Sequence, residues 1–336
     1  MRFALRQLAL AAMLTASLPP SIAAEAPRYG AMLEGFEYPH AVKRYELRSQ
    51  GQTLSMAYMD VPPEKAVSPE RVAVLLHGKN FCAATWERTI ETLSRAGWRV
   101  IAPDQIGFCK SSKPQGYQFS LAQLAANMQA LLASLGVPRA TVIGHSMGGM
   151  LATRYTLMFP QQVERLVLVN PIGLEDWQAE GVPYASIDAL YQNELRTSAD
   201  SIRAYQLRYY YPGGWKPEYE RWVTMQAGLY AGEGRERVAW NQAQTSEMIF
   251  TQPIAHEFAD ITRPTTLMIG GRDRTAPGAN RATPEVAQRL GQYETLGRRT
   301  AAAIPGAQLI EFPELGHSPQ VEAPERFHER LLEALR

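Results

Sequence analysis

The chain has 336 residues, of which 46% are hydrophobic and 20% are charged, the composition of a globular protein with a large core. Its formal net charge is only +1, so neither nucleic acid nor an anionic membrane surface is expected as a partner on charge alone.

Residues 1–24 have the pattern of a signal peptide: a basic start, a short apolar run from Leu8 to Leu18, and small residues suited to cleavage. The alternative is a membrane anchor. The apolar run is about half of the roughly 20 residues that span a bilayer, which favours export without a stable membrane span. We therefore expect a periplasmic or secreted protein whose mature chain begins near residue 25.

Strand-like and helix-like segments alternate from residue 42 to about residue 170. Two segments of alternating polarity, Val42 to Arg48 and Thr53 to Asp60, predict a hairpin. Apolar runs typical of strands buried on both faces follow, with helical patterns between them. These runs are Val72–Leu76, Trp98–Ala102, Ala140–Ile143 and Arg165–Val169.

The alternation stops over residues 171–260, where long helical patterns rich in tyrosine and tryptophan replace it. Strand-like runs return at Thr265–Ile269 and Ala307–Phe312, and an amphipathic helix ends the chain. Strands that alternate with helices predict an α/β fold with a mostly parallel sheet covered on both faces. We expect residues 25–170 and 261–336 to form this core, with 171–260 inserted over one end of the sheet.

The most informative motif is Gly144-His145-Ser146-Met147-Gly148-Gly149, which lies between a strand-like and a helix-like segment. A serine on such a sharp turn exposes its hydroxyl, and the glycines avoid clashes with the neighbouring strand and helix. The N-terminus of the following helix directs free N–H groups towards whatever the hydroxyl attacks. This arrangement is typical of a nucleophile that forms an acyl intermediate.

Asp273 and His317 each follow a strand-like run, so they are expected at the same sheet edge as Ser146. A histidine titrates near neutral pH and can take the serine proton. An aspartate can hold the imidazole in one tautomer and stabilise the imidazolium. A rival acid, Glu175 or Asp176, follows an earlier strand-like run.

The oxyanion of the tetrahedral intermediate needs two convergent N–H donors, and losing one typically costs about 3–4 kcal/mol of transition-state stabilisation. We expect the backbone N–H groups of Met147 and Lys79 in this role. The Lys79 side chain is expected to point into solvent, with attraction of an anionic substrate as the alternative. His77 is expected to brace its own loop.

Together these residues resemble the α/β-hydrolase fold family from about Val42 onward. The resemblance is carried by His77-Gly78, Pro103–Ser111, the Ser146 motif, Asp273 and Gly316-His317. It implies an eight-stranded, mostly parallel sheet flanked by helices, with a helical cap inserted after strand six. Related haloalkane dehalogenases and epoxide hydrolases carry an aspartate nucleophile where this chain has Ser146, so the chemistry of those subfamilies is disfavoured.

Two features depart from the family pattern or extend it. The turn Lys79–Cys82 lacks the Gly/Pro-rich character of carbon–carbon bond hydrolases and proline iminopeptidases, and residues 277–305 are longer than the usual link.

In the family's strand order, the loops holding Cys82 and Cys109 are neighbours. The resemblance therefore allows a disulfide between them, and free thiols remain the alternative.

We interpret the chain as a serine hydrolase that cleaves a small carboxylic ester through an acyl-serine intermediate. The same site could cleave a lactone, an amide or a carbon–carbon bond, and a ligand-binding receptor with vestigial turnover is the alternative outside enzymes. No cofactor is implied. No metal is implied either, because His256-Glu257 lacks the second histidine of a zinc-binding helix.

Overall fold

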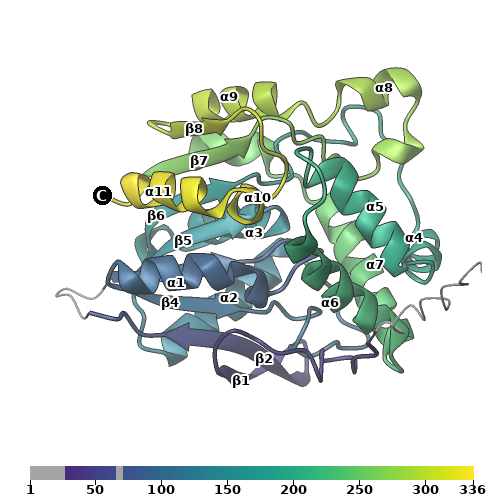
Figure 1. The fold of residues 1–336 in the computed structure, drawn as a ribbon, viewed down its shortest axis with the longest axis horizontal. Coiled ribbons are helices and arrows are strands. Elements are labelled where there is room, and N and C mark those ends of the chain that lie inside the picture. The colour runs from purple at the N-terminus through teal and green to yellow at the C-terminus, as the bar shows by residue number, and fades with distance from the viewer. Residues whose placement is uncertain (1–26, 66–70) are drawn as a thin grey trace, which may run out of the picture.

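The computed structural model describes residues 27–65 and 71–336, so the predicted signal peptide lies outside the described residues. In the described ranges, none of the helices combines the length and apolar character that crossing a membrane requires. A sheet of eight strands forms the centre of the protein (Figure 1). The strands are β1 (Val42–Ser49), β2 (Gln52–Val61), β3 (Arg71–Leu76), β4 (Trp98–Pro103), β5 (Ala140–His145), β6 (Val163–Val169), β7 (Thr265–Gly270) and β8 (Gln308–Phe312).

The strand order is β1-β2-β4-β3-β5-β6-β7-β8. The pairs β1–β2 and β2–β4 are antiparallel, and every other pair is parallel. This confirms the predicted fold class, a mostly parallel eight-stranded sheet. Because β3 to β8 run in the same direction, their C-terminal ends meet at one edge of the sheet.

The predicted hairpin is confirmed by the pairing of β1 with β2, in which Ser49 lies opposite Gln52. The two residues between them, Gln50 and Gly51, have φ values of 50° and 76°. Two positive φ angles are what a tight two-residue hairpin turn requires, and glycine adopts such an angle without steric cost.

The side chains of β3 show how the sheet holds two hydrophobic layers. Val72, Val74 and Leu76 belong to one buried cluster, whereas Ala73 and Leu75 belong to another. This alternation follows from the two-residue period of a strand. A strand buried on both faces therefore appears in the sequence as a continuous apolar run.

Helices cover both faces of the sheet (Figure 1). Buried side chains of α1 and α11 belong to the cluster on one face, and those of α2, α3 and α9 to the cluster on the other. These helices are α1 (Glu87–Arg95), α2 (Leu121–Ser134), α3 (Met147–Met158), α9 (Tyr293–Ala303) and α11 (Pro324–Ala334).

Local sequence explains both ends of helix α2. Ser120 precedes it in an extended conformation, and its hydroxyl accepts the N–H of Gln123, as an N-cap does. The chain leaves the helix at Leu135, followed by Gly136 with a φ of 66°. A glycine in the left-handed region is a common helix terminator.

Four α-helices lie between β6 and β7, and Figure 1 shows them beside the edge of the sheet where the parallel strands end. They are α4 (Ile187–Glu194), α5 (Ala199–Tyr209), α6 (Glu220–Ala231) and α7 (Arg235–Thr251). We call residues 171–260 the insertion.

Residues 277–305, for which no role was predicted, contain three helical elements: the 3-10 helix η5 (Ala279–Arg281), α8 (Pro284–Arg289) and α9. Helix α9 packs against β7 and β8. The short helix α10 (Pro319–Glu322) lies between β8 and α11.

Candidate active site

Ser146 occupies the turn between β5 and α3 with φ 57° and ψ −121°. This is an uncommon conformation for a residue with a side chain, and it persists only where the surroundings enforce it. A Cβ on Gly144 would lie 2.1 Å from the carbonyl oxygen of Gly148, and a Cβ on Gly148 would lie 2.1 Å from that of Leu76. Glycine is therefore required at both positions if the turn is to approach its neighbours so closely.

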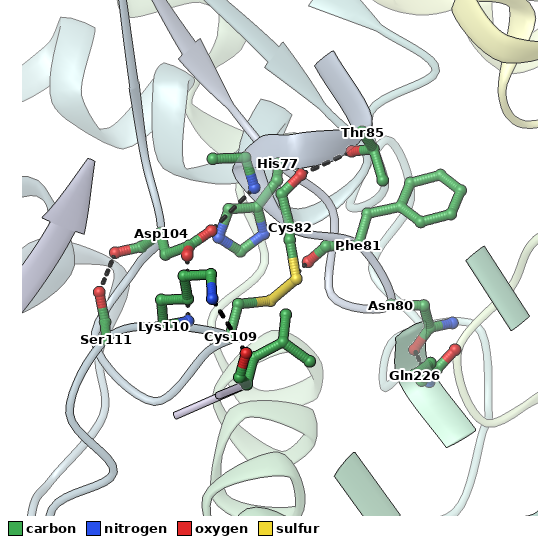
Figure 2. The surroundings of a disulfide bond; sticks show 12 residues. His77, Asn80, Phe81, Cys82, Thr85, Asp104, Cys109, Lys110, Ser111 and Gln226 are labelled. Atoms are coloured by element: carbon green, nitrogen blue, oxygen red, sulfur yellow. Dashed lines mark hydrogen bonds between the residues drawn. A yellow bond between two sulfur atoms is a disulfide. The ribbon is translucent and has the colours of Figure 1, made fainter. Parts of the chain in front are cut away.

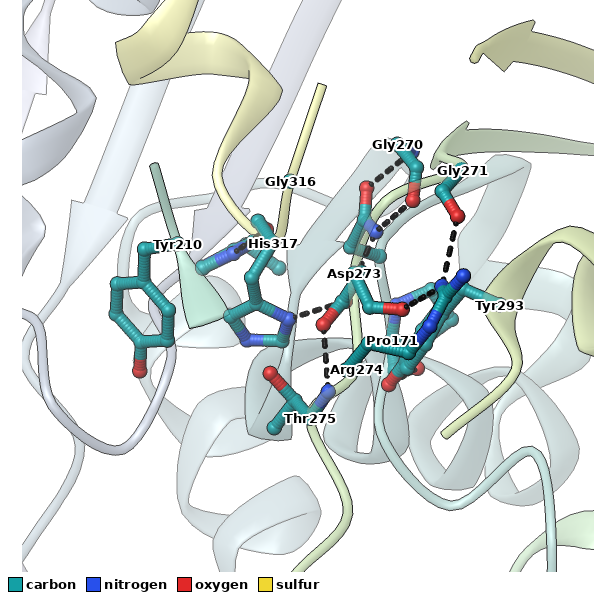
Figure 3. A network of polar contacts seen from close by, with 12 residues as sticks. Pro171, Tyr210, Gly270, Gly271, Asp273, Arg274, Thr275, Tyr293, Gly316 and His317 are labelled. Atoms are coloured by element: carbon teal, nitrogen blue, oxygen red, sulfur yellow. Dashed lines mark hydrogen bonds and ion pairs between the residues drawn. The ribbon is translucent and has the colours of Figure 1, made fainter. Parts of the chain in front are cut away.

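His317 and Asp273 form a buried hydrogen-bonded pair (Figure 3). Nδ1 of His317 lies 2.6 Å from Oδ2 of Asp273, and both side chains are fully buried. The Asp273 carboxylate also accepts the N–H of Thr275 at 2.7 Å and an amide N–H of Asn170 at 3.0 Å. These contacts hold the carboxylate in place and assign the Nδ1 proton of the neutral imidazole to the side facing Asp273.

The other ring nitrogen of His317, Nε2, is buried and has no hydrogen-bond partner among the described residues. It is therefore available as a proton acceptor. No hydrogen bond joins it to the Ser146 hydroxyl in this structure. Unligated active sites commonly lack the hydrogen bond between nucleophile and base, which tightens when substrate binds.

His145 connects the serine turn to the histidine loop. Its Nε2 lies 2.8 Å from the carbonyl oxygen of His317, and the two rings are 4.9 Å apart between centroids. Burial lowers the pKa of His145 well below its usual value, and the neighbouring His317 lowers it further. A neutral His145 can thus donate its Nε2–H to the carbonyl of His317, which brings the loop after β8 beside Ser146.

The rival acids have other partners. Glu175 accepts the backbone N–H of Gly291 at 2.9 Å, and Asp176 lies 2.8 Å from Nε2 of His256. Burial raises the pKa of the Glu175 carboxyl. Of the carboxylates considered from the sequence, Asp273 is the one hydrogen-bonded to His317.

The turn after β3 lies against the serine. A Cβ on Gly78 would lie 2.9 Å from Cβ of Ser146. His77 braces this turn as predicted, because its Nε2 accepts the N–H of Gln105 at 3.0 Å and its Nδ1 lies 2.9 Å from the carbonyl oxygen of Gly78. The backbone N–H groups of Lys79 and Met147 take part in none of the turn and cap hydrogen bonds found in the described ranges.

The predicted orientation of the Lys79 side chain is wrong. Its ammonium forms an ion pair with Glu194 at 2.8 Å, and the two side chains are only 18% and 13% exposed. Glu194 also accepts the hydroxyl of Tyr230. Lys79 therefore connects the turn after β3 to helix α4 of the insertion, which leaves it neither in open solvent nor free to attract a substrate.

Cys82 and Cys109 are joined by a disulfide, with Cα atoms 5.9 Å apart (Figure 2). The bond links the turn after β3 to the loop after β4. Asp104 supports the same region, since its carboxylate accepts the N–H of Ala83 at 2.8 Å and that of Lys110 at 3.0 Å. The two sulfur atoms and an Asp104 oxygen lie within 4.8 Å of one another, but sulfurs bonded to each other are not the thiolates that ligate metals.

A cavity of about 590 Å³ opens beside Ser146. Most of its wall comes from the insertion and from residues 275–281. Its larger apolar and aromatic lining residues are Ile172, Tyr184, Leu190, Ile202, Tyr205, Tyr210, Ile249 and Phe250. Other insertion aromatics pack among themselves, as Tyr211 does on Tyr219 with ring centroids 3.7 Å apart. The cavity is large enough for a small organic substrate.

Two residues beside the pair of His317 and Asp273 were not predicted from the sequence to lie at the site. Asn170, directly after β6, donates to the Asp273 carboxylate and accepts the N–H of Gly270 at 2.8 Å. Tyr210 packs against His317 with ring centroids 4.7 Å apart. The signal for Asn170 was present, because a polar residue directly after an apolar strand lies at the functional edge of a parallel sheet.

A family model described as the alpha/beta hydrolase fold matches residues 72–324. A crystal structure of a probable hydrolytic enzyme from Pseudomonas aeruginosa PAO1 is 61% identical in sequence, with a TM-score of 0.91 over 93% of this chain and 99% of that one. A 2-hydroxy-6-oxononadienedioate/2-hydroxy-6-oxononatrienedioate hydrolase from Comamonas testosteroni is 24% identical over 275 residues, which is 78% of this chain and 86% of that protein.

Similarity to some curated relatives covers only a part of each protein. An uncharacterized protein from Mycobacterium tuberculosis is 39% identical over 101 residues, which spans 30% of this chain and 29% of the relative.

Replacement of Gly148 tests the packing of the serine turn. We expect Gly148→Ala to lower the free energy of unfolding by about 3 kcal/mol or more, because the new Cβ would overlap backbone atoms. Gly297→Ala is the control. The three atoms nearest to its Cβ would all belong to the side chain of Ile269, the first at 3.0 Å, and the helix preference of alanine offsets that contact by about 1 kcal/mol. Urea unfolding that finds both variants as stable as wild type would contradict this account of the turn.

Removal of the disulfide tests its contribution to stability. The bond joins residues separated by 27 positions, and the chain-entropy model gives such a loop about 3.5 kcal/mol of stabilisation. We expect the Cys82→Ser/Cys109→Ser double variant to lose about that much in urea unfolding. Dithiothreitol should destabilise the wild type and leave the double variant unchanged. Two free thiols in the oxidised, purified protein by mass spectrometry would be incompatible with the bond.

Proposed function

The chain belongs to the alpha/beta hydrolase fold family, and on that premise we propose that it is a serine hydrolase that cleaves carboxylic esters through an acyl-serine intermediate. The observation that carries the proposal is the buried pair of His317 and Asp273, whose unpartnered Nε2 lies in the loop packed beside the Ser146 turn. A hydrolase of this type needs those three groups at the wall of a substrate cavity.

In the proposed acylation step, the Ser146 oxygen forms a bond to the ester carbonyl carbon while Nε2 of His317 takes the hydroxyl proton. The tetrahedral intermediate then collapses with cleavage of the bond to the leaving alcohol, which receives that proton. Water enters in place of the alcohol, loses a proton to Nε2 and attacks the acyl-serine. Release of the carboxylic acid returns the proton to the Ser146 oxygen.

Asp273 stabilises the imidazolium that forms in each step and keeps the ring in the productive tautomer. The backbone N–H groups of Lys79 and Met147 are the proposed oxyanion donors. Two observations support this role: the turn after β3 packs against Ser146, and Met147 is the first residue of α3, where helix N–H groups lack intrahelical acceptors. The mechanism uses only groups of the chain and water.

The insertion is proposed to act as a cap that selects the substrate, since it supplies most of the cavity wall. Export to the periplasm or secretion remains a proposal. Two features support it: the signal-like pattern of residues 1–24 and the disulfide, because disulfides persist mainly in oxidising compartments.

Replacement of Ser146 tests the nucleophile. We expect a fluorophosphonate probe to label the wild type at Ser146, and Ser146→Ala to abolish labelling and turnover of activated esters. Thr275→Ala, which changes another residue lining the cavity, should still be labelled. Mass spectrometry that locates the label on a different residue would contradict the assignment. If the folded wild type reacts neither with the probe nor with any ester, the alternative of a ligand-binding receptor with vestigial turnover would be favoured.

Replacement of the acid tests the proton relay. We expect Asp273→Asn to lower kcat by about 10³–10⁴-fold, because an amide favours the wrong imidazole tautomer and cannot stabilise the imidazolium. Asp176→Asn is the matched control and should leave kcat near the wild-type value, since its partner is His256. If Asp176→Asn lowered kcat as much as Asp273→Asn does in esterase kinetics, the assignment of Asp273 as the acid of the relay would be contradicted.

A further inference from the structure

The charged side chains that line the cavity beside Ser146 do not sum to zero net charge. Its charged lining residues are Lys79, Glu194, Arg196, Glu247 and Arg281. Lys79 and Glu194 neutralise each other in an ion pair at 2.8 Å. Among the described residues, the other three have no ion-pair partner. Two guanidinium groups and one carboxylate therefore remain, which leaves this cavity with a net positive charge.

Arg281 is held in a fixed position at the cavity wall. Its Nε donates to the carbonyl oxygen of Pro183 at 3.1 Å, and its guanidinium lies 5.2 Å from the ring centroid of Phe250. Gly278 leaves room for the group, because a Cβ there would lie 2.6 Å from Nη2. Three different segments thus position one guanidinium: the insertion before α4, helix α7 and the turn before η5.

The terminal nitrogens of Arg281 make no hydrogen bond to the described residues, and its side chain donates to them through Nε alone. Burial also lowers the pKa of Arg281, as expected for a cation partly removed from water without a carboxylate beside it. A planar guanidinium with free terminal N–H groups suits bidentate recognition of a carboxylate or similar anion.

The other two unpaired charges are less suited to this role. Arg196 is exposed, and its Nη2 donates to the side-chain oxygen of Asn193 at 3.3 Å. Glu247, on the same helix as Phe250, would repel an anion. Its replacement by glutamine is therefore expected to act in the opposite direction to a replacement of Arg281.

We propose that Arg281 is the anion-binding residue of this cavity, and that the ester cleaved at Ser146 carries a carboxylate or similar anionic group away from the scissile bond. This inference rests on the proposed ester hydrolysis. The anionic group can belong to the acyl part or to the alcohol part of the ester, and the experiment separates these two sources.

The test uses two pairs of esters of similar shape, and in each pair a carboxylate is compared with the uncharged amide. Monoethyl adipate and its terminal amide place the charge in the acyl part, whereas 4-acetoxybutanoate and 4-acetoxybutanamide place it in the alcohol part. We expect kcat/KM of the wild type to be about 10-fold or more higher for the carboxylate member of one pair, as a charge-assisted bidentate contact implies. The preference should shrink as NaCl is added.

Variants assign the preference to Arg281. Arg281→Gln should reduce the carboxylate-to-amide ratio by about 10-fold or more, whereas Arg281→Lys should keep part of it. Glu247→Gln should raise the ratio. Arg139→Gln, an exposed substitution with the same change in charge directly before β5, should leave it as in the wild type. A ratio at or below one in both pairs, or one unchanged by Arg281→Gln, would overturn the inference.

Binding measured without turnover separates this inference from the proposed function. Calorimetry on Ser146→Ala should detect tighter binding of the carboxylate ester than of its amide in at least one pair, and adding Arg281→Gln should remove the difference. Equal binding of the carboxylate and the amide in both pairs would refute the anion site. If the wild type hydrolyses none of the four esters while this binding difference is present, ester hydrolysis fails and the anion site stands.

Discussion

The buried contact between Asp273 and His317 ties together the ends of three neighbouring strands. Asn170 follows β6, Asp273 follows β7 and His317 follows β8, and one carboxylate receives hydrogen bonds from both neighbours. A carboxylate removed from water is costly unless its oxygens are satisfied. The N–H of Thr275 completes the set. The parallel strands place these groups at one edge of the sheet, and hydrogen bonds to the Asp273 carboxylate fix their positions.

Around this pair, rigid connections hold the turn after β3 beside Ser146. The disulfide joins that turn to the loop after β4, and His77 links the same two segments through the N–H of Gln105. The ion pair of Lys79 and Glu194 then joins the turn to the insertion. Proposed oxyanion donors need such positioning, because they stabilise charge only when they are already aimed at it.

Features that depend on local pattern could be predicted from the sequence. Continuous apolar runs predicted the buried strands, and the glycines around Ser146 predicted a turn that tolerates no side chain at positions 144 and 148. The roles of Lys79 and Arg281 could not be predicted. Lys79 meets a carboxylate that lies 115 positions away in α4, and Arg281 lies over a ring of α7. Such contacts depend on how the insertion packs, and no short-range pattern encodes that packing.

The central claim is that Ser146, His317 and Asp273 act as one proton relay. The most direct measurement is a crystal structure of the protein after reaction with a phosphonate ester. The account predicts a covalent bond from the Ser146 oxygen to phosphorus, with Nε2 of His317 within about 3.2 Å of that oxygen and the N–H groups of Lys79 and Met147 directed at a phosphoryl oxygen. An adduct at Ser146 with the imidazole turned away, or an adduct on another residue, would contradict it.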